Sequence, residues 1–214
     1  ELGNGNTLVI HLTLLPYLQA SKELKTKPTQ ASVRELRSMG IQPDFILARA
    51  DYPIDQKILE KISLFCDVEK EAVIPAPTVK SIYEVPLNFN SYHIAELIAK
   101  KLDLGKVKPD LIDWKKLVSK IHAKRKEIKI ALVGKYTGLD DAYISVIESL
   151  KIACYHANRE LVILWIDSEK LEQKNEKTWE LLREAEGIVV PGGFGIRGTE
   201  GKIMSAKYCR ENKI

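Results

Sequence analysis

Residues 187–195 read Gly187-Ile188-Val189-Val190-Pro191-Gly192-Gly193-Phe194-Gly195. The apolar run predicts a short buried strand, and the proline and glycines that follow predict an abrupt turn. Consecutive glycines let a backbone approach a ligand closely and aim N–H groups at it, which is how an oxyanion hole is built without side chains. A tight turn at a strand end is the simpler alternative. From these residues alone the simple turn is the favoured interpretation.

The sequence on either side of this stretch alternates between predicted strands and predicted helices. Residues 128–134 and 161–166 are apolar runs typical of buried strands, and the helix between them carries apolar side chains at spacings of three and four. Shorter helices are predicted over residues 179–185 and 201–212. This alternation predicts a parallel sheet with helices on both faces. The chain stops where another strand is expected.

The N-terminal half shows a similar alternation. The predicted strands are a buried run at 8–15 that ends at Pro16, and shorter runs at 45–48 and 72–74. Predicted helices cover 28–39 and 91–102, and a further helix between them has one apolar face, formed by Ile58, Ile62 and Phe65. We therefore expect two α/β parallel-sheet domains, at 1–102 and 128–214. Residues 103–127, which include a Lys-rich helix and a solvated Lys124-Arg125-Lys126 run, form the expected linker.

Composition limits the possible classes of protein. Of the 214 residues 45% are apolar and 29% are charged, which is typical of soluble globular domains. The net charge of +4, from 33 basic and 29 acidic residues, is too balanced to indicate nucleic-acid binding. The longest apolar stretch, at 7–16, is too short for a membrane-spanning helix. The three cysteines form no CxxC pair, so we expect a reducing cytoplasm. The start at Glu1 lacks a methionine and a signal sequence, which suggests an excised segment.

Two further segments contain candidate anion-binding residues. In Lys25-Thr26-Lys27-Pro28-Thr29-Gln30, two ammonium groups flank a hydroxyl at a predicted helix N-terminus, where free N–H groups and the helix dipole favour phosphate. A solvated helix start explains the same residues equally well. Lys135 closes the first strand of the second domain, where an anion contact is possible and a plain surface lysine is the commoner case.

Taken together, these motifs resemble CTP synthases. The segment Lys25 to Gln30 and the segment Val190 to Glu200 occur in one chain at the order and spacing of that family, with matches between them such as Ser81-Ile82-Tyr83 and Val133 to Tyr136. The resemblance extends from about Thr7 to Ile214. It implies a P-loop-like synthetase domain followed by a flavodoxin-like glutamine amidotransferase domain, both incomplete in this chain.

The resemblance implies a reaction and its ligands. CTP synthases phosphorylate O4 of UTP with ATP and replace the phosphate with ammonia released from glutamine. They use Mg²⁺, are activated by GTP and inhibited by CTP, and form homotetramers with the pyrimidine site at subunit interfaces. The implied location is the cytoplasm, with no nucleic-acid or membrane partner.

The resemblance also assigns residues to each ligand. The UTP/CTP group comprises Lys25, Thr26, Lys27, Pro28, Thr29, Gln30 and Lys61. The ATP group comprises Arg49, Pro77, Thr78 and Val79, although many members have Lys at the position of Pro77 and Asp at that of Thr78. Ala31 likewise replaces a common His. Glutamine and its oxyanion are assigned to Gly192 and Gly193, and GTP to Lys135, Phe194 and Arg197.

No catalytic or metal-binding residue is assigned within the chain. The family's phosphate loop and acidic Mg²⁺ ligands are expected upstream, and its nucleophilic Cys and His-Glu pair downstream, so we expect the chain by itself to be inactive. Cys66, Cys154 and Cys209 are interpreted as packing residues, and His11 as a hydrogen-bonded residue of its strand. Two alternatives stay open: a non-catalytic nucleotide-binding piece, and another glutamine-dependent synthetase.

Overall fold

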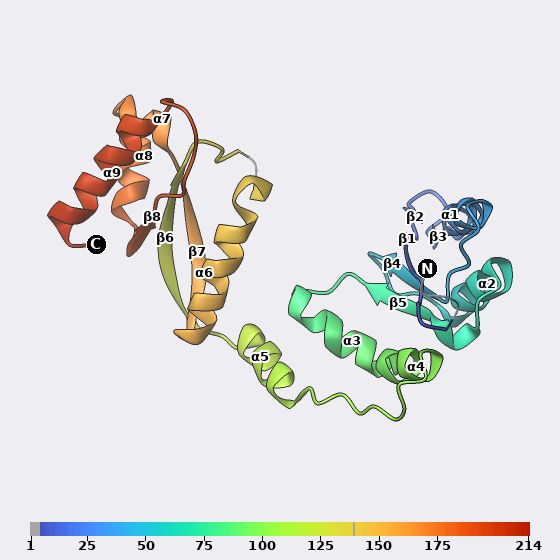
Figure 1. Ribbon diagram of the computed structural model, residues 1–214. Helices are drawn as coiled ribbons and strands as arrows, with labels where there is room; N and C mark the ends of the chain where they lie inside the picture. The colour runs from blue at the N-terminus through green and yellow to red at the C-terminus, as the bar shows by residue number, and fades with distance from the viewer. Residues whose placement is uncertain (1–4, 139) are drawn as a thin grey trace. The chain divides into compact units, whose positions relative to one another are not determined.

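The computed structural model describes residues 5–138 and 140–214. The expectation that the N-terminal residues are those of an excised segment falls mainly on Glu1 to Asn4, which lie outside the described residues. The chain divides into two compact units, and the division falls between Ser119 and Lys120. Each unit contains a three-stranded parallel sheet with helices packed on it (Figure 1). The predicted α/β class with two parallel sheets is confirmed.

The first sheet has the order β1 (Ile10–Leu14), β4 (Phe45–Ala50), β5 (Val73–Pro77), and all its strands are parallel. The connections between these strands contain α1 (Lys27–Ser38) and α2 (Gln56–Cys66). Because the strands are parallel and in register, their carboxyl ends lie at one edge of the sheet, and loops that follow them meet there.

The first helix, α1, forms where its sequence signals predict. Pro28 lies in its first turn, where a missing N–H is tolerated, and Gly40 follows its C-cap with a φ of +81°. Val33, which is 1% exposed, anchors the helix in the core. The predicted span of 28–39 is therefore confirmed to within one residue at each end.

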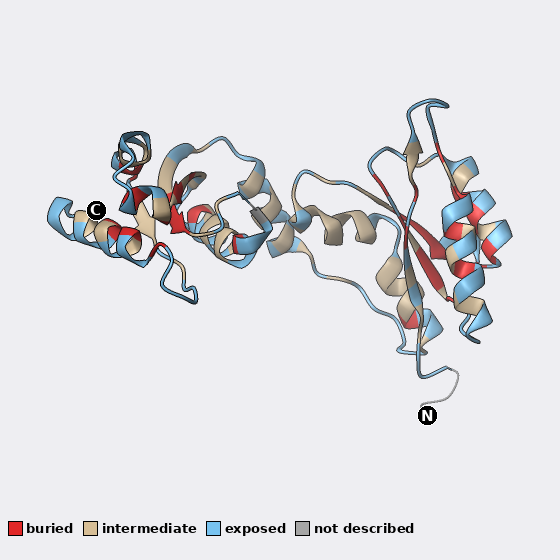
Figure 2. Ribbon diagram, turned by 90° about the horizontal axis from the view of Figure 1, so that it is seen from above, coloured by how far each residue is buried: buried red, intermediate tan, exposed pale blue. Residues whose placement is uncertain are grey.

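The prediction of a buried strand at 8–15 is wrong for one of its faces. Thr13 is buried, but Leu12 and Leu14 are 63% and 54% exposed. Strand β1 is an edge strand, and alternate side chains point to opposite faces of the sheet. In β1, among the described residues, only the side chains that point toward α1 are covered. Figure 2 shows buried residues along the strands and on parts of the helices that pack on them.

In α2 the buried face is also displaced from the prediction. The fully or largely buried residues are Leu59, Ile62 and Cys66, at spacings of three and four, whereas Phe65 is 59% exposed. Ile62 was correctly predicted, but Phe65 lies about 100° around the helix from Cys66. The prediction relied on the larger apolar side chains and therefore assigned Phe65 to the core. In the structure Cys66 takes that core position.

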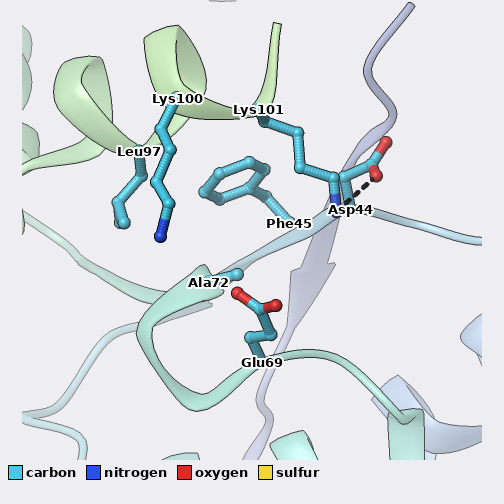
Figure 3. A pocket seen from close by; sticks show the side chains of 7 residues that line it. All are labelled: Asp44, Phe45, Glu69, Ala72, Leu97, Lys100 and Lys101. Carbon is cyan, nitrogen blue, oxygen red and sulfur yellow. Dashed lines mark ion pairs between the residues drawn. The ribbon is translucent and has the colours of Figure 1, made fainter. Parts of the chain in front are cut away.

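The other face of the first sheet receives the helices α3 (Val85–Ser91) and α4 (Ile94–Lys101). The helix predicted at 91–102 corresponds to α4, which begins at Ile94 because His93 takes a φ of +54°, and α3 was not predicted. Between α4 and the sheet a pocket of about 220 Å³ is lined by Phe45, Leu97 and Lys100, among others (Figure 3). The 3-10 turns η1 (Lys70–Ala72) and η2 (Ile82–Glu84) precede β5 and α3.

A small antiparallel hairpin that the sequence analysis did not predict follows β1. Its strands are β2 (Tyr17–Leu18) and β3 (Glu23–Leu24). The ring of Tyr17 packs against that of Tyr52, with centroids 4.1 Å apart. This contact ties the hairpin to the loop that follows β4.

The second sheet has the order β7 (Arg159–Asp167), β6 (Lys126–Gly134), β8 (Gly187–Val189), again all parallel. The predicted strands are confirmed, although β6 begins two residues earlier and β7 is longer at both ends. The helix α5 (Ile112–His122) lies between the two sheets in sequence.

Four helices and a 3-10 turn complete this unit. They are η3 (Asp140–Tyr143), α6 (Ile144–His156), α7 (Ser168–Glu172), α8 (Glu176–Arg183) and α9 (Thr199–Asn212). Helix α7 was not predicted because it is only five residues long and is joined directly to β7. None of the helices in the described part of the chain is long and apolar enough to span a membrane.

The expectation of a solvated Lys124-Arg125-Lys126 run is wrong for Arg125. Its side chain is 2% exposed, pairs with Glu160 at 2.8 Å and lies 4.8 Å from the centre of the Tyr155 ring. It also donates to the carbonyl oxygen of Ile121 at 3.1 Å. Arg125 thus joins the end of α5 to β7 and α6, which a charge pattern alone could not indicate.

Helices α7 and α9 pack so closely that glycine is required at their contact. A Cβ built on Gly201 would lie 1.8 Å from the backbone oxygen of Ser168, which is itself fully buried. That distance is far below any allowed contact, and backbone cannot move aside as a flexible side chain can.

We expect Gly201→Ala to lower the free energy of unfolding of the second unit by about 1–3 kcal/mol, because the overpacking outweighs the helix propensity gained with alanine. Amide hydrogen exchange of β6 would measure this. Gly138→Ala is the matched control, since its Cβ would meet no atom within 4 Å. A Gly201→Ala protein as stable as the parent would show that α7 and α9 separate readily.

Candidate functional site

The first candidate site is a pocket of about 710 Å³ beside the N-terminus of α1. Four of the predicted anion-binding residues from the segment 25–30 line it, together with Lys61 from α2. The complete lining is Pro16, Leu18, Glu23, Leu24, Lys25, Thr26, Lys27, Pro28, Asp55, Ile58 and Lys61. The fold therefore brings together the two lysine-bearing segments that were predicted to share one ligand.

The hairpin and α1 position this pocket. The backbone N–H of Lys25 donates to the carbonyl oxygen of Pro16 at 2.9 Å, which fixes the end of β3 against the start of β2. The chain then turns directly into α1 at Lys27. The first-turn N–H groups of a helix lack intrahelical partners, so the helix end itself favours an anion.

The polar groups of the pocket carry both signs of charge. Lys25, Lys27 and Lys61 supply three ammonium groups, and Glu23 and Asp55 supply two carboxylates. The ammonium of Lys25 hydrogen-bonds the carboxylate of Glu23, and this contact holds the pKa of Glu23 below its ordinary value. An anionic ligand that binds Lys25 must therefore compete with Glu23. Leu18, Leu24 and Ile58 add an apolar wall suited to a flat ring or a sugar.

Thr29 and Gln30, two further members of the predicted group, do not line this pocket. Thr29 is 1% exposed, and its hydroxyl lies 3.0 Å from that of Thr13 on β1. The side-chain amide of Gln30 donates to the hydroxyl of Thr26 at 3.1 Å. These contacts hold the start of α1 against the sheet, so in this structure the two side chains support the lysines.

The second candidate site lies at the carboxyl ends of β4 and β5. Arg49, at the end of β4, pairs with Asp51 at 3.4 Å, and the hydroxyl of Thr78 donates to the same carboxylate oxygen at 2.6 Å. The backbone N–H of Thr78 donates to Ala50 at 2.8 Å. Arg49, Pro77 and Thr78 are thus neighbours at one sheet edge, with Val79 next in the chain. Asp51, which links two of them, was not predicted.

The third candidate site is the glycine-rich loop 191–195 of the second unit. Lys135, directly after β6, donates its ammonium hydrogens to the carbonyl oxygens of Phe194 at 2.8 Å and Gly195 at 2.7 Å. Its own backbone N–H donates to the hydroxyl of Tyr143 at 3.0 Å. Phe194 is fully exposed, and Gly192 and Gly193 are also exposed residues.

Arg197 lies close to the same loop and is held by two neighbours. Its guanidinium pairs with Glu169 at 3.2 Å and lies 5.8 Å from the centre of the Tyr136 ring. Lys135, Phe194 and Arg197, which the sequence analysis assigned to one ligand, are therefore gathered around one loop. Tyr136, half-exposed beside Lys135, is a further candidate contact that the sequence analysis did not select.

The residues described for these three sites include no cysteine and no histidine. Among residues 5–138 and 140–214, no group of three or more His, Cys, Asp or Glu could hold a metal ion. Burial raises the pKa of the thiols of Cys66, Cys154 and Cys209, which disfavours the reactive thiolate. The ring of His11 lies 2.8 Å from the hydroxyl of Ser32, in line with its expected role.

Two protein-family models match the chain. Residues 1–104 match the model described as CTP synthase N-terminus, and residues 139–214 match that of glutamine amidotransferase class-I. The first match covers the sheet of the first unit, and the second covers the second unit from residue 139 onward, so that α5 and β6 lie in the unmatched stretch between them.

The relatives found by sequence agree with these models. CTP synthases from Dehalococcoides mccartyi, Pelotomaculum thermopropionicum and Methanocaldococcus jannaschii are 53%, 50% and 50% identical to the whole chain. The chain covers 39%, 40% and 40% of these relatives, so it spans about two fifths of their length. Among solved structures, the "Trypanosoma brucei CTPS - glutaminase domain with bound acivicin" is 40% identical over 41% of this chain and 34% of that one, with a TM-score of 0.38.

We expect Lys25→Ala to raise the pKa of Glu23 part of the way to its ordinary value, because the hydrogen bond from Lys25 is the largest cause of its depression, followed by a hydrogen bond from Ser21 and the charge of Lys25. In the parent protein the Glu23–Lys25 ion pair is fully present at pH values above the ordinary pKa of a glutamate. It is lost as the pH falls through the lowered pKa of Glu23. An NMR titration of the glutamate carboxyl carbons would measure the change. Glu60, whose pKa is lowered by Lys70, is the internal control and should titrate unchanged. A Glu23 titration that does not move in the variant contradicts the contact.

Proposed function

Because the chain belongs to the CTP synthase family, we propose that it forms part of an enzyme that aminates UTP to CTP. In this proposal ATP phosphorylates O4 of the uracil ring, and ammonia released from glutamine displaces that phosphate. Residues 1–102 contribute to the synthetase half, residues 128–214 to the glutaminase half, and 103–127 link them. The match of residues 1–104 to the synthetase model favours this function over other glutamine-dependent synthetases.

The observation that carries the synthetase half of the proposal is the pocket beside α1. Lys25 and Lys27 come from the chain entering α1, and Lys61 comes from α2, yet all three line one pocket. A triphosphate needs several cationic donors, and charge-assisted hydrogen bonds are the strong ones. We assign this pocket to the phosphates of UTP, and of CTP as a competing inhibitor. Thr26 and Pro28 belong to the same lining, while Thr29 and Gln30 position it.

We assign ATP to the adjacent carboxyl ends of β4 and β5. Arg49 is the cationic group there, and Pro77, Thr78 and Val79 offer backbone groups for an adenine ring. Thr78 takes part through its hydrogen bonds to Ala50 and Asp51, which hold this stretch against Arg49.

In the glutaminase half, we assign glutamine and its oxyanion to the backbone of Gly192 and Gly193, and GTP as activator to Lys135, Phe194 and Arg197. The exposed glycines and the cationic groups around the loop support both assignments. The attacking nucleophile belongs to no residue described here, which fits the raised pKa of each thiol.

The remaining parts of the proposal concern the whole enzyme. We propose a cytoplasmic homotetramer that uses Mg²⁺ with its nucleotides. The described residues offer no cluster of metal ligands, so we assign no residue of this chain to Mg²⁺.

Lys27→Ala in the full-length enzyme should weaken the use of UTP by about tenfold or more, since a hydrogen bond to a charged group contributes roughly 1.5–3 kcal/mol. Steady-state CTP synthesis at varied UTP would measure it, with glutamine hydrolysis assayed alongside and expected to change less. Lys57→Ala is the control, because Lys57 is exposed on α2 and lies outside the lining of this pocket. Unchanged UTP kinetics in Lys27→Ala would contradict the assignment of this pocket to UTP.

Gly193→Ala in the same enzyme should abolish most glutamine-dependent CTP synthesis. The added Cβ would lie 3.4 Å from the ammonium of Lys202, which is an ordinary van der Waals contact, so the methyl group is expected to act by crowding the space where the N–H groups would meet the oxyanion. Loss of one oxyanion-hole donor costs on the order of 10²–10³ in rate. CTP formation from added ammonia should largely survive, because the synthetase half does not use this loop. Equal loss with both nitrogen sources would mean that Gly193 is only structural.

A further inference from the structure

The glycine-rich loop is held at both ends by lysine side chains from different elements. Lys135, after β6, binds the carbonyl oxygens of Phe194 and Gly195. Lys202, on the first turns of α9, donates its ammonium hydrogen to the carbonyl oxygen of Pro191 at 2.8 Å. The sequence analysis selected Lys135 and overlooked Lys202, which lies eleven residues after Pro191 and belongs to no recognisable motif.

The contact of Lys202 fixes the direction of a neighbouring N–H group. The carbonyl of Pro191 belongs to the peptide unit whose N–H is that of Gly192. In a planar trans peptide the C=O and N–H point in opposite directions, so anchoring one aims the other. Glycine has the widest conformational freedom of any residue, and an unanchored Pro191–Gly192–Gly193 segment would sample many orientations. The ammonium therefore supplies the order that the glycines do not have.

Lys202 also brings positive charge to the loop. Its side chain is partly buried, and this burial together with the charge of Lys135 lowers its pKa. A Cβ on Gly193 would lie 3.4 Å from the ammonium nitrogen of Lys202 and 4.0 Å from the terminal carbon of Lys135, so both cationic chains reach the middle of the loop. Two ammonium groups that point inward at backbone carbonyls polarise the peptides and strengthen their N–H groups as donors.

We propose that Lys202 is a positioning residue for glutamine hydrolysis: by holding the carbonyl of Pro191 it aims the N–H group of Gly192 at the side-chain carbonyl oxygen of glutamine as that oxygen becomes an oxyanion. The inference rests on the proposed function and adds a residue that the family resemblance does not supply. Lys202 touches neither substrate nor reacting atoms in this role, so its effect falls on the rate of the glutaminase step.

The test compares Lys202→Met, Lys202→Arg and Lys207→Met in the full-length enzyme. Methionine keeps the length of the chain and removes the donor, arginine keeps a cationic donor, and Lys207 is an exposed lysine of the same helix. Each variant is assayed for CTP synthesis with glutamine and with free ammonia, and kcat and KM are determined for glutamine.

We expect Lys202→Met to lower kcat with glutamine by about ten- to a hundredfold, less than the loss of a donor itself, because the N–H group of Gly192 remains but is misaimed. The KM for glutamine and the ammonia-dependent rate should change by less than about threefold. Lys202→Arg should recover most of the glutamine-dependent kcat, and Lys207→Met should match the parent.

Three outcomes overturn the inference. An unchanged glutamine-dependent kcat in Lys202→Met shows that the loop needs no anchor. Equal losses with glutamine and ammonia, or no recovery with arginine, show that Lys202 acts only on stability. Gly193→Ala separates these failures from failure of the proposed function. If that variant loses only glutamine-dependent synthesis while Lys202→Met is normal, the role of Lys202 alone is refuted; if Gly193→Ala is also normal, the glutamine assignment itself is refuted.

Discussion

The parallel register of the two small sheets is the constraint on which every candidate site depends. Strands β1, β4 and β5 run in one direction, so the chain leaves each of them at the same edge, and the same is true of β7, β6 and β8. Arg49 and Thr78, far apart in sequence, meet at one such edge, and Lys135 reaches the loop after β8 at the other. A change of register by one residue would point these side chains to the opposite face.

A second feature is common to all three sites: each contains at least one cationic group that already has a partner within the chain. Lys25 binds Glu23, Arg49 pairs with Asp51, Arg197 pairs with Glu169, and Lys135 holds two carbonyl oxygens. These contacts reduce the number of side-chain orientations that a ligand would have to select, which favours binding. They also oppose it, because an incoming phosphate must replace a carboxylate. The pairs are exposed to solvent, where ion pairs are weak, so replacement is feasible.

The errors of the sequence-based predictions share one physical origin. Apolar pattern located β1 and α2 correctly but assigned Leu12, Leu14 and Phe65 to the core, because pattern identifies faces without showing which face another element covers. Arg125 shows the converse case, since a basic run looks solvated until the partners that bury it are known. Short elements such as the β2–β3 hairpin and α7 carry too few residues for a periodic signal.

The sequence by itself determined the two α/β units, most of their strands and helices, the family, and the segments 25–30 and 191–195 that carry the candidate chemistry. It could do so because helix caps, glycine turns and apolar periodicity are local properties of the chain. The family resemblance already grouped Lys61 with Lys25 and Lys27, which line one pocket in the structure. Only the tertiary structure decided that Glu23 competes for the ammonium group of Lys25, and that Lys202 holds the loop beside Gly192. Each of these depends on distances between groups that are separated along the chain. Such distances are set by the packing of the folded chain, which cannot be read directly from the order of the residues.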